Sequence, residues 1–388
     1  MTKQPIYLDY NATTPMASEV VEAVQPYLRE HFGNPSSAHV YGAPGRRAIQ
    51  TAREAIAALL GAAPDEILFT SGGTESNNLA IKGVVRAKGA RGDHVITSAI
   101  EHPAVAEVCR WLVEQGFRVT VLPVDAHARV RPADLEAAID PDTVLVSIMH
   151  ANNEVGTMQP ISELSEIAHR HGALMHTDAA QSVGKVPVDV DELGVDLLTV
   201  AGHKLYAPKG IGALFVRRGV RLAPLLHGAG HEGGLRPGTE NVPWIVGLGE
   251  AARLASCDLP GQTAHLSALR DRLYEGLVRA LGGEMVRRNG HPAASLPNTL
   301  SVAFRGRRAD ELLARIAGRV AASAGSACHA GEVQLSPVLR AMGTPEVWAA
   351  GTLRLSAGRF TTEEEIDRAA AALVTAVRES PERTVEEL

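Results

Sequence analysis

Short apolar runs alternate with helix-length amphipathic segments from about residue 17 to residue 260. The segments 78–87 and 161–171 have the periodicity of helices. Five runs rich in apolar and β-branched residues predict buried strands: 67–70, 94–97, 119–122, 144–148 and 197–200. This alternation predicts an α/β fold with a mostly parallel sheet, whose ligands should lie beyond the carboxyl ends of the strands.

The pattern changes after Gly261. A long charged helix around 266–279 precedes short strands near 298–304 and 352–356, and a helical tail follows over 362–379. We therefore expect a large domain over residues 15–260 and a smaller α+β domain over 261–388, which the extended residues 1–14 join.

Composition narrows the class of protein. The chain has 388 residues, of which 45% are hydrophobic, so it can bury the cores of two or three domains. A formal charge of −6 argues against a nucleic-acid surface. No apolar stretch reaches the length of a signal peptide or of a membrane span. We expect a cytoplasmic protein with neither nucleic acid nor membrane as a partner.

The three cysteines, Cys109, Cys257 and Cys328, are too few and too scattered for a disulfide framework or a four-ligand zinc site. Cys109 and Cys257 belong to amphipathic helical patterns, which favours packing roles. Cys328 lies in small and polar residues that predict an exposed, mobile loop over about 321–336. A protonated His329 would favour its thiolate and make it a nucleophile, although an accidental surface cysteine is an alternative.

Lys204 and Asp178 have the residue types of a pyridoxal phosphate site. Each follows a predicted strand. The amine can form a Schiff base, and the carboxylate can hold the pyridinium nitrogen protonated. Gln181 could meet the ring hydroxyl, whereas a helix-capping role is the competing interpretation of Asp178.

Other candidates also follow strands. The glycine-rich turn at Gly73 and Thr74 opens a helix, where free N–H groups and a hydroxyl suit a phosphate. His102 could stack on a cofactor ring and exchange protons, or be an ordinary loop histidine. Arg354 interrupts an apolar strand and could grip a substrate carboxylate, form an internal salt bridge or face solvent on an edge strand. The residues predict no metal site.

Nine segments taken in order resemble motifs of the cysteine desulfurases of group I, which are NifS- and IscS-like enzymes. This group belongs to the class V aminotransferase family of fold type I pyridoxal phosphate (PLP) enzymes. The resemblance runs over essentially the whole chain and implies a seven-stranded, mostly parallel sheet in the large domain. The matching segments are 7–15, 32–37, 73–76, 101–102, 152–156, 178–185, 202–204, 236–241 and 326–328.

The resemblance implies a role for each residue around the cofactor. Lys204 would hold PLP covalently, Asp178 and Gln181 would bind the ring, and His102 would stack on it and act in catalysis. Asn153 would lie at the ring edge, close to the substrate.

Further roles concern the phosphate and the substrate. Gly73, Thr74 and His203 would bind the phosphate, and Arg354 would take the substrate carboxylate. Thr239 would reach the phosphate bound to a partner subunit, which implies a homodimer.

By the same resemblance the enzyme converts L-cysteine to L-alanine, and Cys328 becomes a persulfide. The sulfur would pass to an acceptor protein, such as an iron–sulfur scaffold, or to a thio-cofactor or tRNA-thiolation pathway. His329 after the cysteine is similar to selenocysteine lyase, but Pro103 stands where those lyases carry Asp. L-selenocysteine is therefore the alternative substrate. A non-catalytic partner protein and an ordinary aminotransferase are less favoured.

One departure concerns Ala201, where the family usually has serine. A phosphate hydrogen bond would be missing unless a water or another donor replaces it, which would lower PLP affinity.

Overall fold

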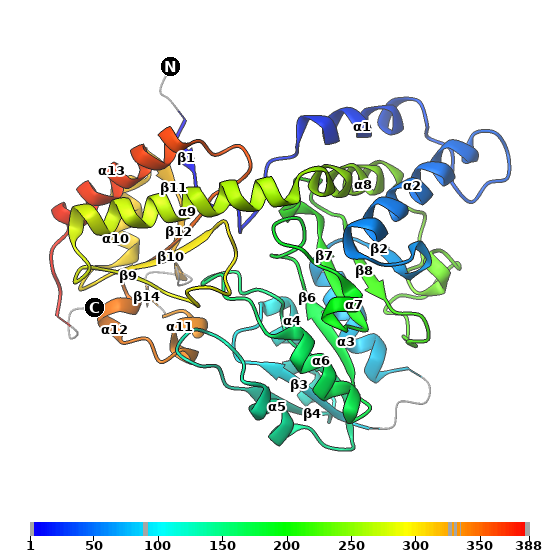
Figure 1. The fold of residues 1–388 in the computed structure, drawn as a ribbon. Helices are drawn as coiled ribbons and strands as arrows, with labels where there is room; N and C mark the ends of the chain where they lie inside the picture. Colours follow the sequence, from blue (N-terminus) through cyan, green and yellow to red (C-terminus); the bar gives the residue numbers. More distant parts are fainter. Residues whose placement is uncertain (1–3, 88–91, 325–327, 330–331, 334, 385–388) are drawn as a thin grey trace.

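The computed structural model describes residues 4–87, 92–324, 328–329, 332–333 and 335–384. A seven-stranded sheet organises the larger part of the molecule (Figure 1). Its spatial order is β2 (Ile67–Thr70), β8 (Gly212–Val216), β7 (Leu197–Ala201), β6 (Leu174–Asp178), β5 (Thr143–Ser147), β3 (His94–Ser98) and β4 (Arg118–Leu122). Strand β8 runs opposite to the other six strands, which share one direction. The predicted α/β class and mostly parallel sheet are confirmed.

Helices cover both faces of the sheet. Consecutive strand residues point to opposite sides, so each strand contributes to two buried clusters. Val95 and Leu145 pack with helices α3 (Gly73–Val85) and α4 (Pro103–Glu114) in one buried cluster. Their neighbours Ile96 and Val146 pack into a second cluster on the other face. The helices that contribute to the second cluster include α1 (Ser18–Arg29), α2 (Gly42–Leu60), α5 (Pro132–Ala138), α6 (Ile161–Arg170) and α8 (Val242–Cys257).

A separate buried cluster lies in the C-terminal part of the chain. It joins a four-stranded sheet, in the order β12 (Ser323–Ala324), β15 (Thr352–Ser356), β10 (Thr299–Phe304) and β9 (Val286–Arg288), to helices α9 (Leu259–Leu281), α10 (Ala309–Ile316) and α13 (Glu363–Glu379). Figure 1 shows α9 and α13 side by side over this sheet. Ile6 and Leu8 belong to the same cluster. This arrangement supports the division into two domains, whose boundaries stay a prediction.

The start of the chain pairs with the C-terminal part. Strand β1 (Ile6–Tyr7) runs parallel to β11 (Val320–Ala321). The backbones of β13 (Cys328–His329) and β14 (Glu332–Val333) pair antiparallel within the predicted loop. These strands of two residues are too short to produce a sequence periodicity. The side chains of Cys328 and His329 lie outside the described part of the chain, and so does the predicted mobility of the loop.

The remaining short elements are η1 (Pro64–Glu66), α7 (Val190–Leu193), η2 (Gly202–Lys204), η3 (Glu232–Gly234), α11 (Pro337–Ala341) and α12 (Glu346–Ala349). Among the described helices, none is long and apolar enough to cross a membrane.

Two cysteines test the packing interpretation. Cys109 is buried in the cluster with α3, as predicted. Cys257 is exposed, so its predicted packing role is wrong. It is the last residue of α8, where the helical periodicity no longer dictates which side chains face the core.

We predict that Gly249→Ala destabilises the fold. Gly249 lies where α8 crosses α2, and an added Cβ would stand 2.5 Å from the Cα of Ala52. Overpacking of this kind costs about 1–3 kcal/mol, which thermal melting would detect as a lower Tm. Gly318→Ala is the matched control, since a Cβ there meets nothing within 4 Å. Equal melting of the two variants would contradict the close-packing argument.

Candidate active site

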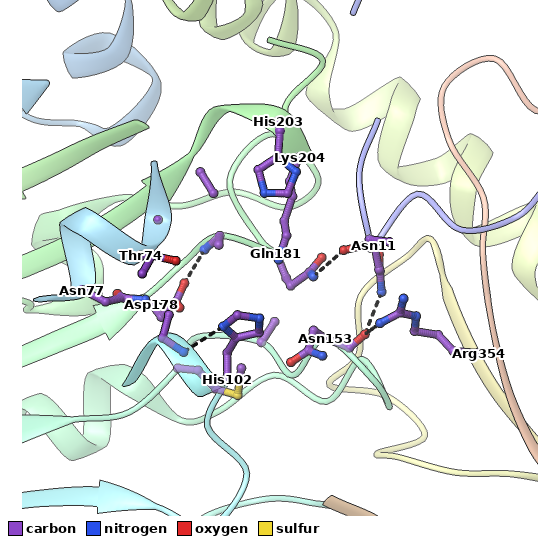
Figure 2. A pocket seen from close by; sticks show the side chains of 17 residues that line it. Asn11, Thr74, Asn77, His102, Asn153, Asp178, Gln181, His203, Lys204 and Arg354 are labelled. Atoms are coloured by element: carbon purple, nitrogen blue, oxygen red, sulfur yellow. Dashed lines mark hydrogen bonds between the residues drawn. The ribbon is translucent and has the colours of Figure 1, made fainter. Parts of the chain in front are cut away.

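A cavity of about 320 Å³ lies beyond the carboxyl ends of the central strands (Figure 2). Nine of the eleven site residues predicted from the sequence line it: Gly73, Thr74, His102, Asn153, Asp178, Gln181, His203, Lys204 and Arg354. Thr239 is exposed and does not line the cavity of this chain. Cys328 cannot be placed, because its side chain is outside the described residues.

Lys204 and Asp178 come from adjacent parallel strands. Asp178 ends β6, and Lys204 ends the short helical turn η2 that follows β7. The Asp178 carboxylate accepts hydrogen bonds from Asn77 Nδ2 at 2.7 Å and from the Ala180 N–H at 2.9 Å. These two donors fix the carboxylate at the floor of the cavity, and both carboxylate oxygens are held in place.

The electrostatic setting of Lys204 favours its neutral amine. Removal from bulk water lowers the pKa of Lys204, and the positive charge of Arg354 lowers it further, whereas Asp178 opposes the shift. A lysine with a lowered pKa is a better nucleophile toward carbonyl groups.

His102 is held as the N-cap of α4. Its Nδ1 accepts a hydrogen bond from the Ala104 N–H at 3.1 Å, so in the neutral ring the proton resides on Nε2. Burial, and then the charge of Lys204, lower the pKa of His102. The ring therefore enters the site as a neutral imidazole with a defined tautomer.

The N-terminus of α3 provides anion-binding groups. Gly72 precedes the helix with a φ of 147°, a conformation that favours glycine. The first N–H groups of α3, including those of Gly73 and Thr74, have no partner within the helix. His203 lies on the same side of the cavity (Figure 2), and burial followed by the charge of Lys204 lowers its pKa to about 4.

Arg354 reaches the cavity from β15, in the C-terminal part of the chain. One guanidinium nitrogen lies 2.8 Å from Asp9 Oδ1, and another donates to the Asn153 carbonyl oxygen at 3.1 Å. Arg354 is thus in an internal salt bridge, one of the alternatives left open by the sequence. Its Nε is buried without a hydrogen-bond partner in the described structure, so part of the guanidinium remains available.

The donor set of this cavity fits a phosphorylated pyridoxal. Lys204 offers an amine, Asp178 a carboxylate for a ring nitrogen, and the N-terminus of α3 a phosphate site. The Asn77 Oδ1 atom is buried without a partner beside Asp178. Cationic groups outnumber carboxylates in the lining, which suits a ligand that carries a phosphate and a substrate that carries a carboxylate.

The sequence of the whole chain decides the family. Residues 6–369 match the class-V aminotransferases. The chain belongs to the class-V aminotransferase family. Cysteine desulfurases of this family use PLP, and PLP is the cofactor of this chain.

Two curated relatives are named cysteine desulfurase IscS. That of Methanosarcina thermophila is 49% identical over 94% of this chain and 89% of its own length. That of Dictyoglomus turgidum is 47% identical over 94% of this chain and 92% of its own length.

Solved structures agree with this assignment. A NifS-like protein superposes with a TM-score of 0.89 at 39% identity, covering 96% of this chain and 98% of its own. SspA in complex with cysteine superposes with a TM-score of 0.79 at 41% identity, covering 92% of this chain and 100% of its own. The fold type I architecture predicted for a class-V aminotransferase is confirmed.

Sequence reasoning missed several lining residues of the class-V site. Asn77 stands three positions after Thr74 on the same helix, and that spacing could have placed both on one face. Asn11 lines the cavity from the N-terminal segment, although it lies within a matching motif. No local pattern distinguishes its role, because its partners are distant in sequence.

Ala201 lies at the phosphate end of the cavity. A Cβ built on Gly73 would stand 3.2 Å from that of Ala201, so a hydroxyl added to Ala201 would face the start of α3. We expect Ala201→Ser to tighten PLP binding by about 0.5–1.5 kcal/mol, or roughly twofold to twelvefold. Cofactor loss during dialysis measures the effect. Unchanged or faster loss would mean that the position needs no further donor.

Glu101 lies behind His102 with a buried carboxyl group. Its Oε1 accepts from Ser98 Oγ at 2.5 Å and from the Met149 N–H at 3.0 Å, while its Oε2 has no partner in the described structure. Desolvation, with a further contribution from the charge of Asp178, raises the pKa of Glu101 to about 8.

This raised pKa predicts a loss of stability with rising pH. Between pH 4.5 and about 8 the native carboxyl keeps a proton that the unfolded chain releases, so rising pH favours unfolding. Glu101→Gln cannot titrate and should melt progressively higher than the wild type across this window. A difference in Tm between the two proteins that stays constant from pH 5 to 8 would refute the raised pKa of Glu101.

Proposed function

We propose that this chain is a PLP-dependent cysteine desulfurase, which converts L-cysteine to L-alanine and leaves the sulfur on Cys328. The observation that carries the proposal is the convergence of Lys204, Asp178 and Arg354 in one cavity of a class-V aminotransferase whose curated relatives are named cysteine desulfurases. A related structure was solved in complex with cysteine.

Residues on three sides of the cavity would hold the cofactor. Lys204 would bind it covalently, Asp178 and Gln181 would hold the ring, and His102 would stack on it. Gly73, Thr74 and His203 would bind the phosphate. When bound, PLP supplies an electron sink for the electrons of the substrate Cα–H bond.

Arg354 binds the substrate carboxylate, and Asn153 helps to position it. The carboxylate must compete with Asp9 for the guanidinium or use its unpartnered Nε side. As a free amine with a lowered pKa within the cavity, Lys204 could act as the base that takes the Cα proton of the substrate. His102, with its proton on Nε2, can deliver a proton to the reacting group.

Cys328 is the nucleophile in this proposal. Its thiolate attacks the substrate sulfur, the new S–S bond forms, the substrate C–S bond breaks, and the carbon fragment takes up a proton to become alanine. The balance is one cysteine and one thiol in, and one alanine and one persulfide out. The loop over 321–336 then carries the sulfur to an acceptor.

Selenocysteine is the second candidate substrate, because His329 follows Cys328 as in selenocysteine lyases. Parallel assays with L-cysteine and L-selenocysteine, each followed by alanine formation, separate the two. Alanine formation from L-selenocysteine, with none from L-cysteine, would favour the lyase.

The proposal includes a cytoplasmic homodimer in which Thr239 reaches the phosphate of the partner's site. The exposure of Thr239 outside the cavity of its own chain is compatible with this role. The sulfur acceptor is a protein, for which an iron–sulfur scaffold is the first candidate, since the relatives carry the name IscS.

We predict that Cys328→Ser keeps the absorbance of bound PLP but loses at least a hundredfold in alanine formation from L-cysteine, because serine is a far weaker nucleophile toward sulfur. Chromatographic measurement of alanine and alkylation of the persulfide are the readouts. Cys257→Ser is the matched control, since Cys257 is exposed and does not line the cavity. Wild-type turnover by Cys328→Ser would rule out the persulfide mechanism.

A further inference from the structure

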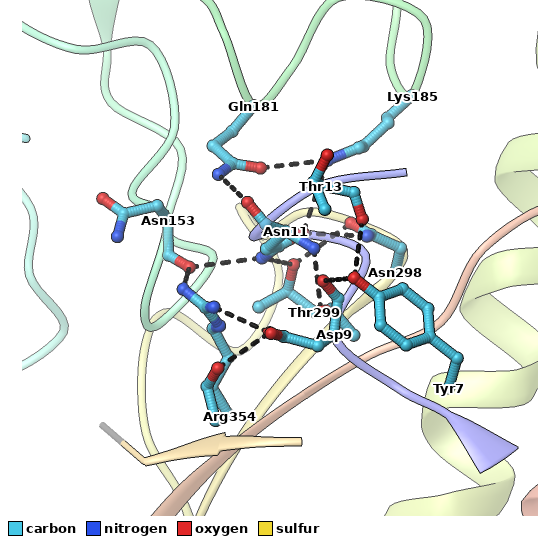
Figure 3. A network of polar contacts seen from close by, with 12 residues as sticks. Tyr7, Asp9, Asn11, Thr13, Asn153, Gln181, Lys185, Asn298, Thr299 and Arg354 are labelled. Carbon is cyan, nitrogen blue, oxygen red and sulfur yellow. Dashed lines mark hydrogen bonds and ion pairs between the residues drawn. The ribbon is translucent and has the colours of Figure 1, made fainter. Parts of the chain in front are cut away.

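Lys185 is a buried lysine that lies next to the cavity without lining it. Its exposed fraction is 6%, and it forms no ion pair with any carboxylate of the described residues. Its Nζ donates instead to two amide oxygens, Gln181 Oε1 at 3.0 Å and Asn11 Oδ1 at 3.3 Å (Figure 3). Burial of a cation without a carboxylate is costly, and an apolar side chain would fill the space at lower cost. Packing therefore does not account for Lys185.

The Gln181 amide lies between two groups with opposite requirements. Its Nε2 donates to the Asn11 carbonyl oxygen at 3.0 Å, and its Oε1 accepts from Lys185. A carbonyl oxygen can only accept and an ammonium can only donate, so both contacts select the same orientation of the amide. The reversed amide would place oxygen against oxygen and NH₂ against ammonium.

This orientation determines what Gln181 offers to the cavity that it lines. The second N–H of Nε2 donates to no residue in the described parts of the chain. We propose that Lys185 is a positioning residue, which fixes the Gln181 amide so that an N–H donor faces the ring hydroxyl oxygen of the cofactor. The inference rests on PLP as the cofactor and assigns to Lys185 a role that acts through Gln181.

The positioning role tolerates a change in the charge of Lys185. Desolvation, and then the positive charges of Lys204 and Arg354, lower the pKa of Lys185 to about 7. A neutral amine still has two N–H bonds, and Lys185 has two acceptors to satisfy. The amide orientation is therefore retained on both sides of this pKa.

Asn11 anchors the arrangement to the C-terminal part of the chain. Its Oδ1 accepts from Asn298 Nδ2 at 3.0 Å, and its Nδ2 donates to Thr299 Oγ1 at 2.8 Å. The Asn11 side chain thus cannot turn without the loss of contacts from β10 and the residue before it. Both acceptors of Lys185 are consequently fixed from outside, as Figure 3 shows.

The test compares Lys185→Met with the wild type and uses PLP itself as the probe. An N–H donated to the ring oxygen stabilises its ionised form. We expect the pH midpoint of the absorbance change of bound PLP to rise by roughly 0.5–1 unit, and the apparent Kd of the apoprotein for PLP to rise roughly threefold to tenfold. Lys82→Met, which removes a lysine that lies over the Trp111 ring and does not line the cavity, should change neither quantity.

Gln181→Ala provides the decisive background. If Lys185 acts through Gln181, Lys185→Met should produce no further shift in a protein that already lacks the amide. A shift of the same size in both backgrounds, or no shift in either, overturns the proposal. Thermal melting identifies folded variants. If Lys185→Met does not fold, Lys185→Arg takes its place: a donor-only head group should keep the wild-type midpoint, and a midpoint equal to that of Gln181→Ala refutes the role.

These readouts separate the inference from the proposed function. Absorbance and PLP affinity require a bound cofactor but no turnover of cysteine. A wild-type protein that binds PLP and forms no alanine would therefore refute the desulfurase activity alone, while an absent coupling between Lys185 and Gln181 would refute the positioning role alone.

Discussion

The crowding of three basic side chains, Lys204, Lys185 and Arg354, at the carboxyl ends of the strands is the constraint around which this site is built. Lys204, Lys185 and Arg354 each lower the pKa of a neighbouring group, and Asp178 is the carboxylate at the floor of the same cavity. Arg354 is paired with Asp9, and the lowered pKa values of Lys204 and Lys185 favour their neutral amines, so the cavity limits its own positive charge. An anionic cofactor or substrate in the cavity would favour the protonated lysines and would be bound more tightly for that reason.

The N-terminal segment connects the two halves of the site. Asn11 contacts Gln181 and the Asn153 carbonyl in the large domain and Thr299 in the small one, while Asp9 pairs with Arg354. Asp9 Oδ1 also accepts from Ser323 Oγ on β12 at 2.9 Å. The residue that holds Arg354 is thus bonded to the strand that leads toward Cys328. A single carboxylate, that of Asp9, thus contacts both Arg354 and β12.

The order of local patterns along the chain predicted a mostly parallel sheet and residues at its carboxyl ends that line the cavity, whereas the seven strands were implied by the family resemblance and β8 had no predicted counterpart. Lys204, Asp178 and His102 follow strands of a parallel sheet, so topology alone brings them together. Arg354 was predicted by its charge within an apolar strand, but its partner Asp9 is 345 positions away and has no local signature. Lys185 was visible only as part of a motif, because its importance depends on which atoms of Gln181 it faces. The roles proposed for Thr239 and Cys328 would involve a second subunit and a side chain outside the described residues, so neither follows from the geometry of this cavity.

The contacts of Asn11 also have a consequence for the time at which the site forms during synthesis. Its backbone N–H donates to Ser356 Oγ, and Arg354 lies on the same strand, β15. Helices α1 to α8 and the main sheet emerge from the ribosome long before that strand, so the floor of the cavity with Lys204 can fold first. The N-terminal segment can form its contacts with β15 only after the last tenth of the chain has been synthesised. A nascent chain can thus present a folded cofactor platform, but it becomes competent to hold a substrate only after its translation is nearly complete.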